Sequence, residues 1–497
     1  MKTHNTHMMK RTLTLLFAAA LCGCGTPHTP SDYAIVAGPG ILDDPQWKGV
    51  VEALNESHPG AQVITYSDSV GEALGALRRT APRYVAFVER PEQVGRDYII
   101  ALNRMSRAVD ADIYADYLWG VITGYDAAAA RRMVLDARTP LEIRSAVSTL
   151  REVSGAKWFE SFAYVDDRYK GLCGEKRPGE DSVRHYQTPH RLPDGRPDLL
   201  RDFCDFYAAY DPDLVTTASH ATERNLEMPY SVGNLRCADG ALYADFPAGR
   251  EALRESGKRR VFLPIGNCLI GNVNNTRESM AIAWMNSAHA AAMVGYVVPT
   301  WYGRSGWGGL KYWLTSPGRY TLSEAFFLNQ QDLLHQLEGW CPRLGDKAFP
   351  FSAEGFAEED FERANEVAGR ELNIDEAGFF FDRDVLAFYG DPAWEVRLRE
   401  LPDEQDYTVT MQTDAEGCTL TIVTAPNFSA ERMAGDHFKE EHVKDLPFSY
   451  FFPERLDRPR LAEGEPWEAA LDENFLLIYH PGFEPGKSYT IRIETGE

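Results

Sequence analysis

Several features that would point to particular protein classes are missing from this chain of 497 residues. Positive charge is scarce, since 51 Lys and Arg stand against 74 Asp and Glu and the formal net charge is −23. Nucleic acids are bound by clustered positive charge, so they are not expected as partners. The sequence contains no Cys-x-x-Cys pair that would suggest zinc and no EF-hand spacing that would suggest calcium. It also has no Gly-x-Ser-x-Gly elbow that would suggest a serine hydrolase.

Long apolar runs are also absent, because no stretch after the N-terminal region reaches the about 20 residues of a membrane-spanning helix. Apolar residues nevertheless make up 44% of the chain and aromatic residues 12%, which is ample for folded cores. The length allows two to four domains. The sequence contains neither an internal repeat nor a long low-complexity segment. We therefore expect a globular chain of a few domains.

The N-terminal segment is typical of an export signal. Residues 8–11 form a short segment that ends in the basic residues Lys10 and Arg11. Residues 12–21 form an apolar run too short to cross a bilayer. The run ends in Leu21-Cys22-Gly23-Cys24, which resembles the lipobox of bacterial lipoproteins. We expect a signal peptide over 1–23 and a lipid on Cys24. Two alternatives remain, a plain cleaved signal and lipidation of Cys22.

The expected anchor predicts where the protein works. Residues 24–32 form a short tether before the first predicted strand. The chain from Cys24 onward has a formal charge of −26, since the signal carries three basic residues and no acid, so the acyl chains must provide the attachment. We expect an exported lipoprotein at the periplasmic face of a membrane, at the outer membrane or at the cell surface.

From residue 33 to about 400, short β-branched or apolar runs alternate with helical patterns. Examples are YAIVA from residue 33, YVAFV over 84–88, LVTTA over 214–218 and RVFLPI over 260–265. This alternation predicts an α/β domain with a mostly parallel sheet covered by helices on both faces, built as one unit or as two subdomains over 33–150 and 151–400. The acidic stretch 349–375 is expected to be irregular.

The character changes after residue 401. Alternating or apolar runs over 407–411, 418–423, 475–479 and 489–493 are separated by turn residues. They predict a small all-β sandwich domain over 401–497.

Two reactive side chains follow predicted strands of the α/β domain. LVTTA leads into Ser219-His220-Ala221, and RVFLPI leads into Gly266-Asn267-Cys268. In parallel sheets ligands bind beyond the carboxyl ends of the strands. A cysteine with a histidine in reach forms a nucleophile and base, while the N–H groups of Cys268 and of the residue after His220 can bind an oxyanion. Taken singly, each residue is more often structural.

The order of these motifs resembles the gingipain-type branch of the caspase-fold (clan CD) cysteine peptidases. The resemblance rests on PRYVAFVERPEQV (82–94), DADIYADYLWG (110–120), FLPIGNCLIGNVNNTRESMAIAWM (262–285), MVGYVVPTWYGRSGWGGLKYW (293–313) and AFYGDPAW (387–394). It implies a caspase-like α/β fold over 33–400. It also implies an Ig-like domain after it, which fits the β-rich tail.

The resemblance assigns roles to individual residues. Cys268 becomes the nucleophile and His220 the general base and acid, and Asn267 and Gly266 support the nucleophile. An acidic residue that assists the histidine matches Asp166 or Asp167, of which we favour Asp167. Trp307 matches an aromatic wall of the specificity pocket.

The sequence also departs from the family. Ala221 stands where the family usually has glycine, and the acidic pocket residue cannot be placed, with Glu175, Glu180 and Asp181 as candidates. No propeptide separates the tether from the first strand. No cofactor is required, and calcium, which some relatives hold, has no motif here.

The sequence thus predicts a lipid-anchored cysteine endopeptidase acting on protein or peptide substrates through an acyl-enzyme. One alternative is a catalytically degenerate caspase-fold lipoprotein that binds or scaffolds, which the departure at Ala221 and the missing propeptide favour. Another is a hydrolase using Ser219 or Ser305, which no nucleophile elbow supports.

Overall fold

The computed structural model of the chain describes residues 32–151, 158–230, 233–352, 357–401, 406–434, 443 and 445–496. The expected signal peptide (1–23), Cys24 and the tether up to residue 31 lie outside the described residues. Within those ranges, no helix combines the length and the apolar character that a membrane crossing requires.

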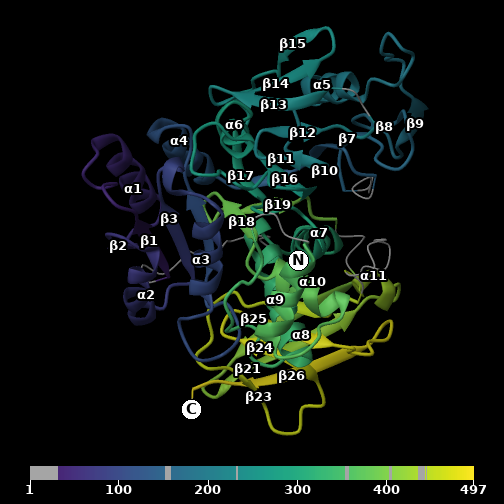
Figure 1. Cartoon of the computed structure of the whole chain (residues 1–497). Coiled ribbons are helices and arrows are strands. Elements are labelled where there is room, and N and C mark those ends of the chain that lie inside the picture. Colours follow the sequence, from purple (N-terminus) through teal and green to yellow (C-terminus); the bar gives the residue numbers. More distant parts are fainter. Residues whose placement is uncertain are drawn as a thin grey trace, which may run out of the picture.

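A twelve-stranded sheet forms the centre of the molecule (Figure 1). Its strands, in spatial order, are β2 (Gln62–Thr65), β1 (Tyr33–Ala37), β3 (Tyr84–Val88), β4 (Leu118–Ile122), β18 (Leu386–Tyr389), β17 (Ala290–Tyr296), β16 (Arg260–Asn267), β10 (Leu214–Ser219), β6 (Ser145–Ser148), β7 (Ser161–Val165), β8 (Leu172–Lys176) and β9 (Arg184–Gln187). Pairing is parallel among β1 to β4 and from β17 across to β7. β18 runs antiparallel to β17, and β8 and β9 form an antiparallel edge. The predicted mostly parallel sheet is confirmed.

Helices cover both faces of this sheet. Their bounds are α1 (Pro45–Ser57), α2 (Leu74–Thr80), α3 (Arg96–Ser106), α4 (Ala127–Ala137), α5 (Leu199–Tyr210), α6 (Met280–Asn286), α7 (Arg304–Thr315), α8 (Leu322–Trp340), α9 (Glu358–Ala368) and α10 (Ile374–Asp382), with 3-10 turns η1 (Val70–Ala73) and η2 (Pro91–Gln93). α1, α4 and α6 pack in succession along one face, whereas α7 and α8 pack together on the other. Because both faces are covered, β1 and β3 are buried along their whole length, which explains their continuous apolar runs.

The stretch 349–375, expected to be irregular, contains helix α9. Its first turn carries Glu358, Glu359 and Asp360, which favour a helix N-terminus, and Gly369 ends it in a left-handed conformation at φ 75°. Acidic residues at the start and glycine at the end are a helix signature, and here they outweigh the polar composition that suggests a loop.

A second, antiparallel sheet follows directly after His220 and was not expected from the sequence. Its strands are β11 (Ala221–Thr222), β12 (Asn225–Glu227), β13 (Asn234–Ala238), β14 (Ala241–Phe246) and β15 (Gly249–Ala252). Asp239 and Gly240 turn between β13 and β14 with positive φ at both residues, 51° and 70°. An Asp-Gly pair between alternating runs is the signal that predicts such a hairpin.

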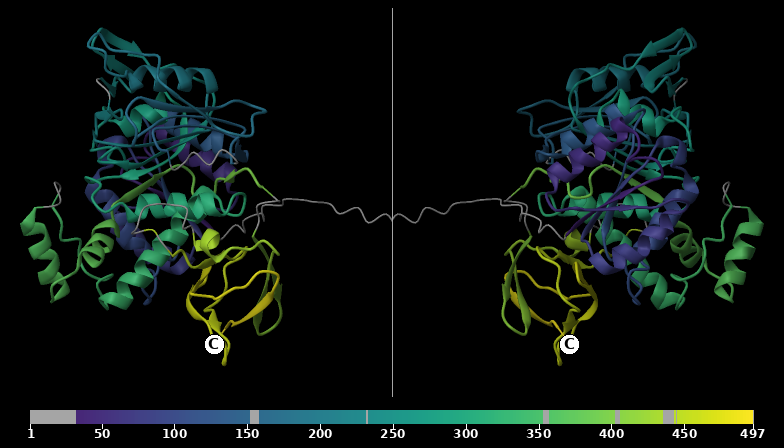
Figure 2. Two further views of the ribbon diagram at one scale, coloured as in Figure 1. Left: turned by 90° about the vertical axis from the view of Figure 1, so that its right-hand side faces the viewer. Right: turned by 90° about the vertical axis from the view of Figure 1, so that its left-hand side faces the viewer.

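The C-terminal region forms the predicted β-sandwich, at the opposite end of the molecule from the hairpin sheet (Figures 1 and 2). One sheet contains β20 (Tyr407–Thr413), β21 (Gly417–Thr424), β26 (Ser488–Glu494) and β23 (Arg460–Leu461), and the other contains β22 (Phe448–Phe451), β25 (Phe475–Tyr479) and β24 (Glu468–Asp472). A short helix, α11 (Ala430–Ala434), and a two-stranded sheet of β5 (Leu141–Ile143) and β19 (Val396–Leu398) complete the fold.

The sandwich is packed firmly onto the α/β domain. Phe475 and Leu477 of β25 belong to the large core of the α/β domain, while the other face of the same strand fills the sandwich core. Tyr320 donates to the Ser449 carbonyl at 2.7 Å, and Tyr479 donates to Asp332 at 2.9 Å. The two parts therefore share apolar burial and buried polar contacts.

Candidate active site

The register of two neighbouring strands places His220 beside Cys268. β10 and β16 pair in parallel, with Ala218 opposite Gly266 and Ser219 opposite Asn267. His220 and Cys268 are the residues directly after the ends of these two strands. Since neighbouring strands lie about 4.8 Å apart, the two residues leave the sheet side by side at its carboxyl edge.

Asn267 joins these two strand ends. Its buried side chain accepts a hydrogen bond from Thr217 Oγ1 at 2.5 Å and donates one to the Ser219 carbonyl at 2.9 Å. Both partners lie on β10, next to His220. The predicted support residue therefore fixes the histidine-bearing strand against the cysteine-bearing strand.

The Cys268 thiol lies against the peptide of Thr300, which follows β17. Thr300 N–H donates to Sγ at 3.2 Å, and Sγ lies 3.8 Å from the Thr300 carbonyl oxygen. Burial raises the pKa of the Cys268 thiol above its ordinary value, although the Thr300 N–H opposes this rise. The thiol is therefore protonated at neutral pH and needs a base to become a nucleophile.

His220 is exposed at the junction between β10 and the hairpin sheet. Its carbonyl accepts from the Glu227 N–H at 3.0 Å, while its imidazole makes no hydrogen bond with another described residue. Ala221 begins β11 and pairs with Leu226, which holds the peptide after His220 in the hairpin. The histidine thus has a fixed backbone and a ring open to solvent.

The hairpin after His220 is also tied to the loop after Cys268. The Glu223 carbonyl accepts from the Met280 N–H at 2.7 Å, and Glu223 Oε1 accepts from Asn272 Nδ2 at 3.2 Å. Sequence reasoning missed Glu223, because nothing local marks a residue whose partners lie about fifty positions further along the chain.

Gly266 and Trp307 meet at the base of the site. A Cβ on Gly266 would lie 2.4 Å from the Ala218 Cβ and 3.3 Å from Trp307 Cζ2. Trp307 lies on α7 and is half-buried. Two predicted site residues are thus brought next to the end of β16, and glycine at 266 is required by the close approach of β10.

We expect Gly266→Ala to lower the free energy of unfolding by about 1–3 kcal/mol, because overpacking forces neighbouring atoms apart. Urea unfolding measures this change. Ala218→Gly in the same chain removes the colliding methyl group and should recover part of the loss. If Gly266→Ala is as stable as the unchanged protein, the close approach is not as described.

Asp166 and Asp167 follow β7, two strands from β10. Asp166 is fully buried and accepts hydrogen bonds from the Arg168 and Tyr169 N–H groups at 2.8 Å. Asp167 accepts from the Arg151 N–H at 3.3 Å. Among the described residues, neither carboxylate is hydrogen-bonded to His220. Asp166 instead stabilises the turn that follows β7. The predicted assistance to His220 is therefore not supported by a hydrogen bond.

A cavity of about 910 Å³ opens beside the cysteine. Leu269, directly after Cys268, and Pro299, directly before Thr300, line one side. Pro39, Tyr66 and Glu89, which follow β1, β2 and β3, line the other. We call this hollow the edge cavity, since it lies where the carboxyl ends of both halves of the sheet meet.

The charged side chains that line the edge cavity are mainly acidic. Asp68, Glu89, Asp97 and Glu223 line it, against Arg96. Glu89 is fully buried and accepts from the Tyr66 hydroxyl at 2.7 Å, and burial raises its pKa. The three acids considered from the sequence, Glu175, Glu180 and Asp181, do not line this cavity. Glu89 directly follows the apolar strand that ends at Val88, and this strand-end position could have marked it as a candidate site residue in the sequence.

The six described cysteines, Cys268 among them, are free thiols. Burial raises the pKa of Cys173 well above its ordinary value, that of Cys204 to about 12 and that of Cys237 to about 11. These three thiols are therefore poor nucleophiles at neutral pH.

Comparison with known proteins finds matches among solved structures. No family model matches the chain, and no curated protein matches it. Among solved structures it is similar to the Arg-specific cysteine proteinase gingipain R (RgpB), with 10% identity over 95% of this chain and 94% of that chain and a TM-score of 0.44. It is also similar to the complex of the pro- and mature domains of RgpB from Porphyromonas gingivalis, with 9% identity over 94% and 93% and a TM-score of 0.42.

A third similar structure is described as a protease, with 9% identity over 94% of this chain and 98% of that chain and a TM-score of 0.38. The likeness to these three structures has a TM-score below 0.5 in each case. At these identities it assigns no residue a role, and the function is argued from the site itself.

Proposed function

We propose that this chain is a cysteine peptidase that cleaves peptide bonds with Cys268 as nucleophile and His220 as general base and acid. The observation that carries the proposal is the β10–β16 register, with Ser219 opposite Asn267, which sets both residues at one strand edge. Asn267 and the Glu223 contacts hold the two segments together.

The reaction proceeds in two halves. His220 takes the Cys268 proton as Sγ attacks the carbonyl carbon of the scissile bond, which gives a tetrahedral oxyanion. Its collapse breaks the C–N bond, His220 protonates the leaving amine, and a thioester remains. A water molecule, deprotonated by His220, then attacks the thioester and releases the carboxylic acid and the Cys268 thiol. The Cys268 and Ala221 N–H groups are the proposed oxyanion donors.

The resting thiol explains why a base is needed. Sγ contacts Thr300, and burial raises its pKa. The proposed attack requires Sγ to leave Thr300 and approach His220, and a change between staggered rotamers about χ1 is the proposed movement. Hydrogen bonds of catalytic pairs are often formed only once substrate is bound.

The edge cavity is the proposed site for one side of the substrate. Its four acidic side chains against one basic side chain favour a basic or neutral peptide segment over an acidic one. Trp307, packed at Gly266, is proposed to wall the substrate on the side of α7. Asp167 remains the proposed assistant of His220, although it now contacts Arg151.

The lipid on Cys24 completes the proposal. It holds the peptidase at a bacterial membrane, so that substrates at the same surface are met most often. A variant that begins after Cys24 should keep its activity on free peptides but lose activity on membrane-bound substrates.

A thiol-directed acyl probe tests the dyad. A peptidyl acyloxymethyl ketone should label the protein at Cys268 only, as shown by peptide mass mapping. Cys268→Ala should abolish labelling and His220→Ala should slow it by about a hundredfold or more, whereas Cys237→Ala, a half-buried thiol on β13, should label normally. Label that stays on another cysteine in Cys268→Ala would falsify the dyad.

The pH dependence of that labelling separates assisted from unassisted attack. Without His220, the reaction needs free thiolate, and the raised pKa of Cys268 moves its rise to alkaline pH. We expect the His220→Ala rate to keep increasing above pH 9, while the unchanged protein reaches its plateau near neutral pH. Identical profiles would show that His220 does not act on Cys268.

The second candidate is a degenerate relative that binds peptides without cleaving them. The observations that favour it are the Thr300-bound thiol, the exposed ring of His220 and the engagement of Asp166 in its own turn. It predicts peptide binding in the edge cavity with no cleavage of any peptide library, and the same labelling rate with and without His220.

A further inference from the structure

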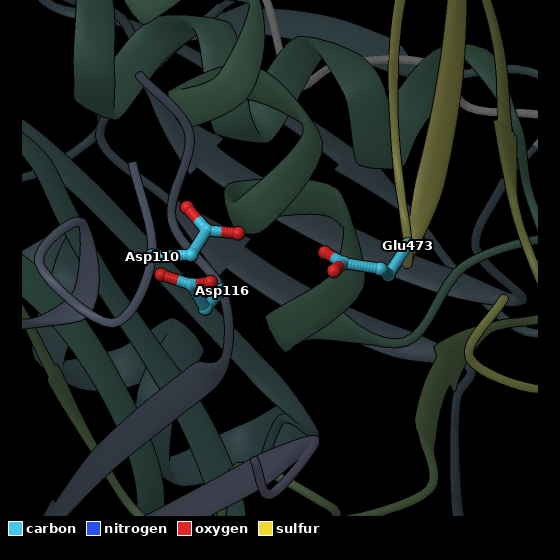
Figure 3. A group of neighbouring side chains, drawn as sticks. All are labelled: Asp110, Asp116 and Glu473. Atoms are coloured by element: carbon cyan, nitrogen blue, oxygen red, sulfur yellow. The ribbon is translucent and has the colours of Figure 1, made fainter. Parts of the chain in front are cut away.

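Three carboxylates converge where the sandwich meets the α/β domain (Figure 3). Asp110 and Asp116 come from the segment between α3 and β4, and Glu473 comes from the turn between β24 and β25. One oxygen from each lies within 4.8 Å of the other two. Figure 3 shows Glu473 pointing across the interface toward the two aspartates. We call these three residues the interface carboxylates.

The buried member of this group has an unused ligand atom. Asp116 is 2% exposed, and its Oδ2 is buried without a hydrogen-bond partner among the described residues. Glu473 Oε2 is in the same condition. A buried carboxylate oxygen without a partner is costly, and none of the described residues supplies a hydrogen-bond partner for Asp116 Oδ2.

The positive charge near the interface carboxylates does not balance their negative charge. Arg455 Nη2 lies 3.4 Å from Glu473 Oε1, while the carboxylates of Asp112 and Asp472 add further negative charge beside the three. The group therefore repels itself when it is ionised.

The backbone around the group is fixed. Asn474, next to Glu473, is fully buried and donates through Nδ2 to the Asp116 carbonyl at 3.0 Å. Arg455 Nη1 donates to the Ala81 carbonyl at 2.6 Å. The carboxylates are thus presented by two rigid segments, one from each side of the interface.

We propose that the interface carboxylates bind one Ca²⁺ ion that joins the C-terminal sandwich to the α/β domain. Three carboxylates without histidine or cysteine are the hard oxygen ligands that Ca²⁺ takes, and they do not suit zinc. Ca²⁺ accepts six to eight oxygens in flexible geometry, so further carboxylate oxygens and water complete its shell. Mg²⁺ requires stricter octahedral geometry and keeps more of its water.

This site has no counterpart in the sequence patterns that mark calcium loops. Glu473 is separated by more than 350 positions from the two aspartates, and neither segment has EF-hand spacing. It is distinct from the proposed cysteine site, and its occupancy can be tested without any peptidase activity.

The first measurement is calcium binding by the chain from residue 25 to 497, stripped with EDTA. Titration calorimetry should give one site per chain, with a Kd of about 10⁻⁴–10⁻³ M, as in extracellular modules. Unfolding should shift to higher temperature in 10 mM CaCl₂ by several degrees relative to EDTA, because the ion binds the folded state only. Absence of binding at 10 mM, or tighter binding of Mg²⁺, would overturn the proposal.

Asp116→Asn and Glu473→Gln separate ligation from folding. Both keep the shape of the side chain and remove one charge, so in EDTA they should unfold at the same or a higher temperature than the unchanged protein. In CaCl₂ they should gain little, with affinity lowered at least tenfold. Asp110→Asn, at the exposed member, repeats the test where a folding defect is not expected.

Glu52→Gln is the matched control, since Glu52 is an exposed acid on α1 paired with Lys48. It should bind Ca²⁺ as the unchanged protein does. If all three interface variants keep the full calcium shift, the ion binds elsewhere and the site is rejected.

Discussion

Cys268→Ala is expected to lower kcat/KM for peptide hydrolysis by at least about a thousandfold, because the acyl-enzyme cannot form without the thiol. His220→Ala should cause a loss of similar size, since burial keeps the thiol protonated at neutral pH and His220 is the proposed base. The two residues act as a unit, so the double variant should lose little more than either single variant.

Initial rates on a fluorogenic peptide library measure these losses. Circular dichroism and the unfolding midpoint must stay unchanged, which isolates the chemistry from folding. Cys204→Ala serves as the control, because Cys204 lies on α5 and burial raises its pKa to about 12. Full activity in Cys268→Ala would refute the proposed nucleophile. Losses that multiply in the double variant would mean that His220 acts independently of Cys268.

Asp332→Ala is expected to lower the free energy of unfolding by about 3–5 kcal/mol, the range for a buried ion pair that loses one partner. Asp332 on α8 is fully buried and pairs with Arg304, which is 1% exposed and begins α7. Two further guanidinium nitrogens of Arg304 have no hydrogen-bond partner in the described ranges. Without Asp332, a buried positive charge therefore stays unpaired.

The same carboxylate also joins the two domains. Asp332 accepts from Tyr312 at 3.2 Å on α7 and from Tyr479 at 2.9 Å on β25 of the sandwich. The loss should therefore appear both in urea unfolding and as earlier exposure of the sandwich to protease.

A matched pair of variants tests the electrostatic reason. Asp346→Asn, at an exposed acid paired with Arg343, should change stability by less than about 0.5 kcal/mol. Arg304→Met combined with Asp332→Leu should recover much of the loss, since apolar side chains replace both charges. An Asp332→Ala protein of unchanged stability would show that Arg304 finds another partner.

Local sequence patterns determined the elements that position the site. Continuous apolar runs such as YVAFV and RVFLPI require cover on both faces, and that requirement already implies a mainly parallel sheet. Because functional residues lie beyond the carboxyl ends of such strands, His220 and Cys268 could be named as a pair from the sequence. The β-sandwich followed in the same way from the alternation after residue 401.

Pairings between distant segments were decided only by the tertiary structure. The hairpin sheet β11 to β15 separates β10 from β16 in sequence, and the register of Ser219 with Asn267 depends on packing that no local pattern reports. The place of β18 between β17 and β4 is likewise non-local. The same holds for the contacts of Asp166, whose position after a strand resembled that of a catalytic acid.

The edge cavity and the interface carboxylates show the reason. Glu89 and Leu269 line one hollow, and Asp116 and Glu473 face one another, although each pair is far apart along the chain. Periodicity and turn residues report how much of each segment is buried, which is a local property. Which buried surfaces meet depends on the free energy of the whole packed core. The sequence by itself therefore determined the strands, the sandwich and the two candidate catalytic residues, and only the tertiary structure decided their register, the cavity beside them and the group of carboxylates at the domain interface.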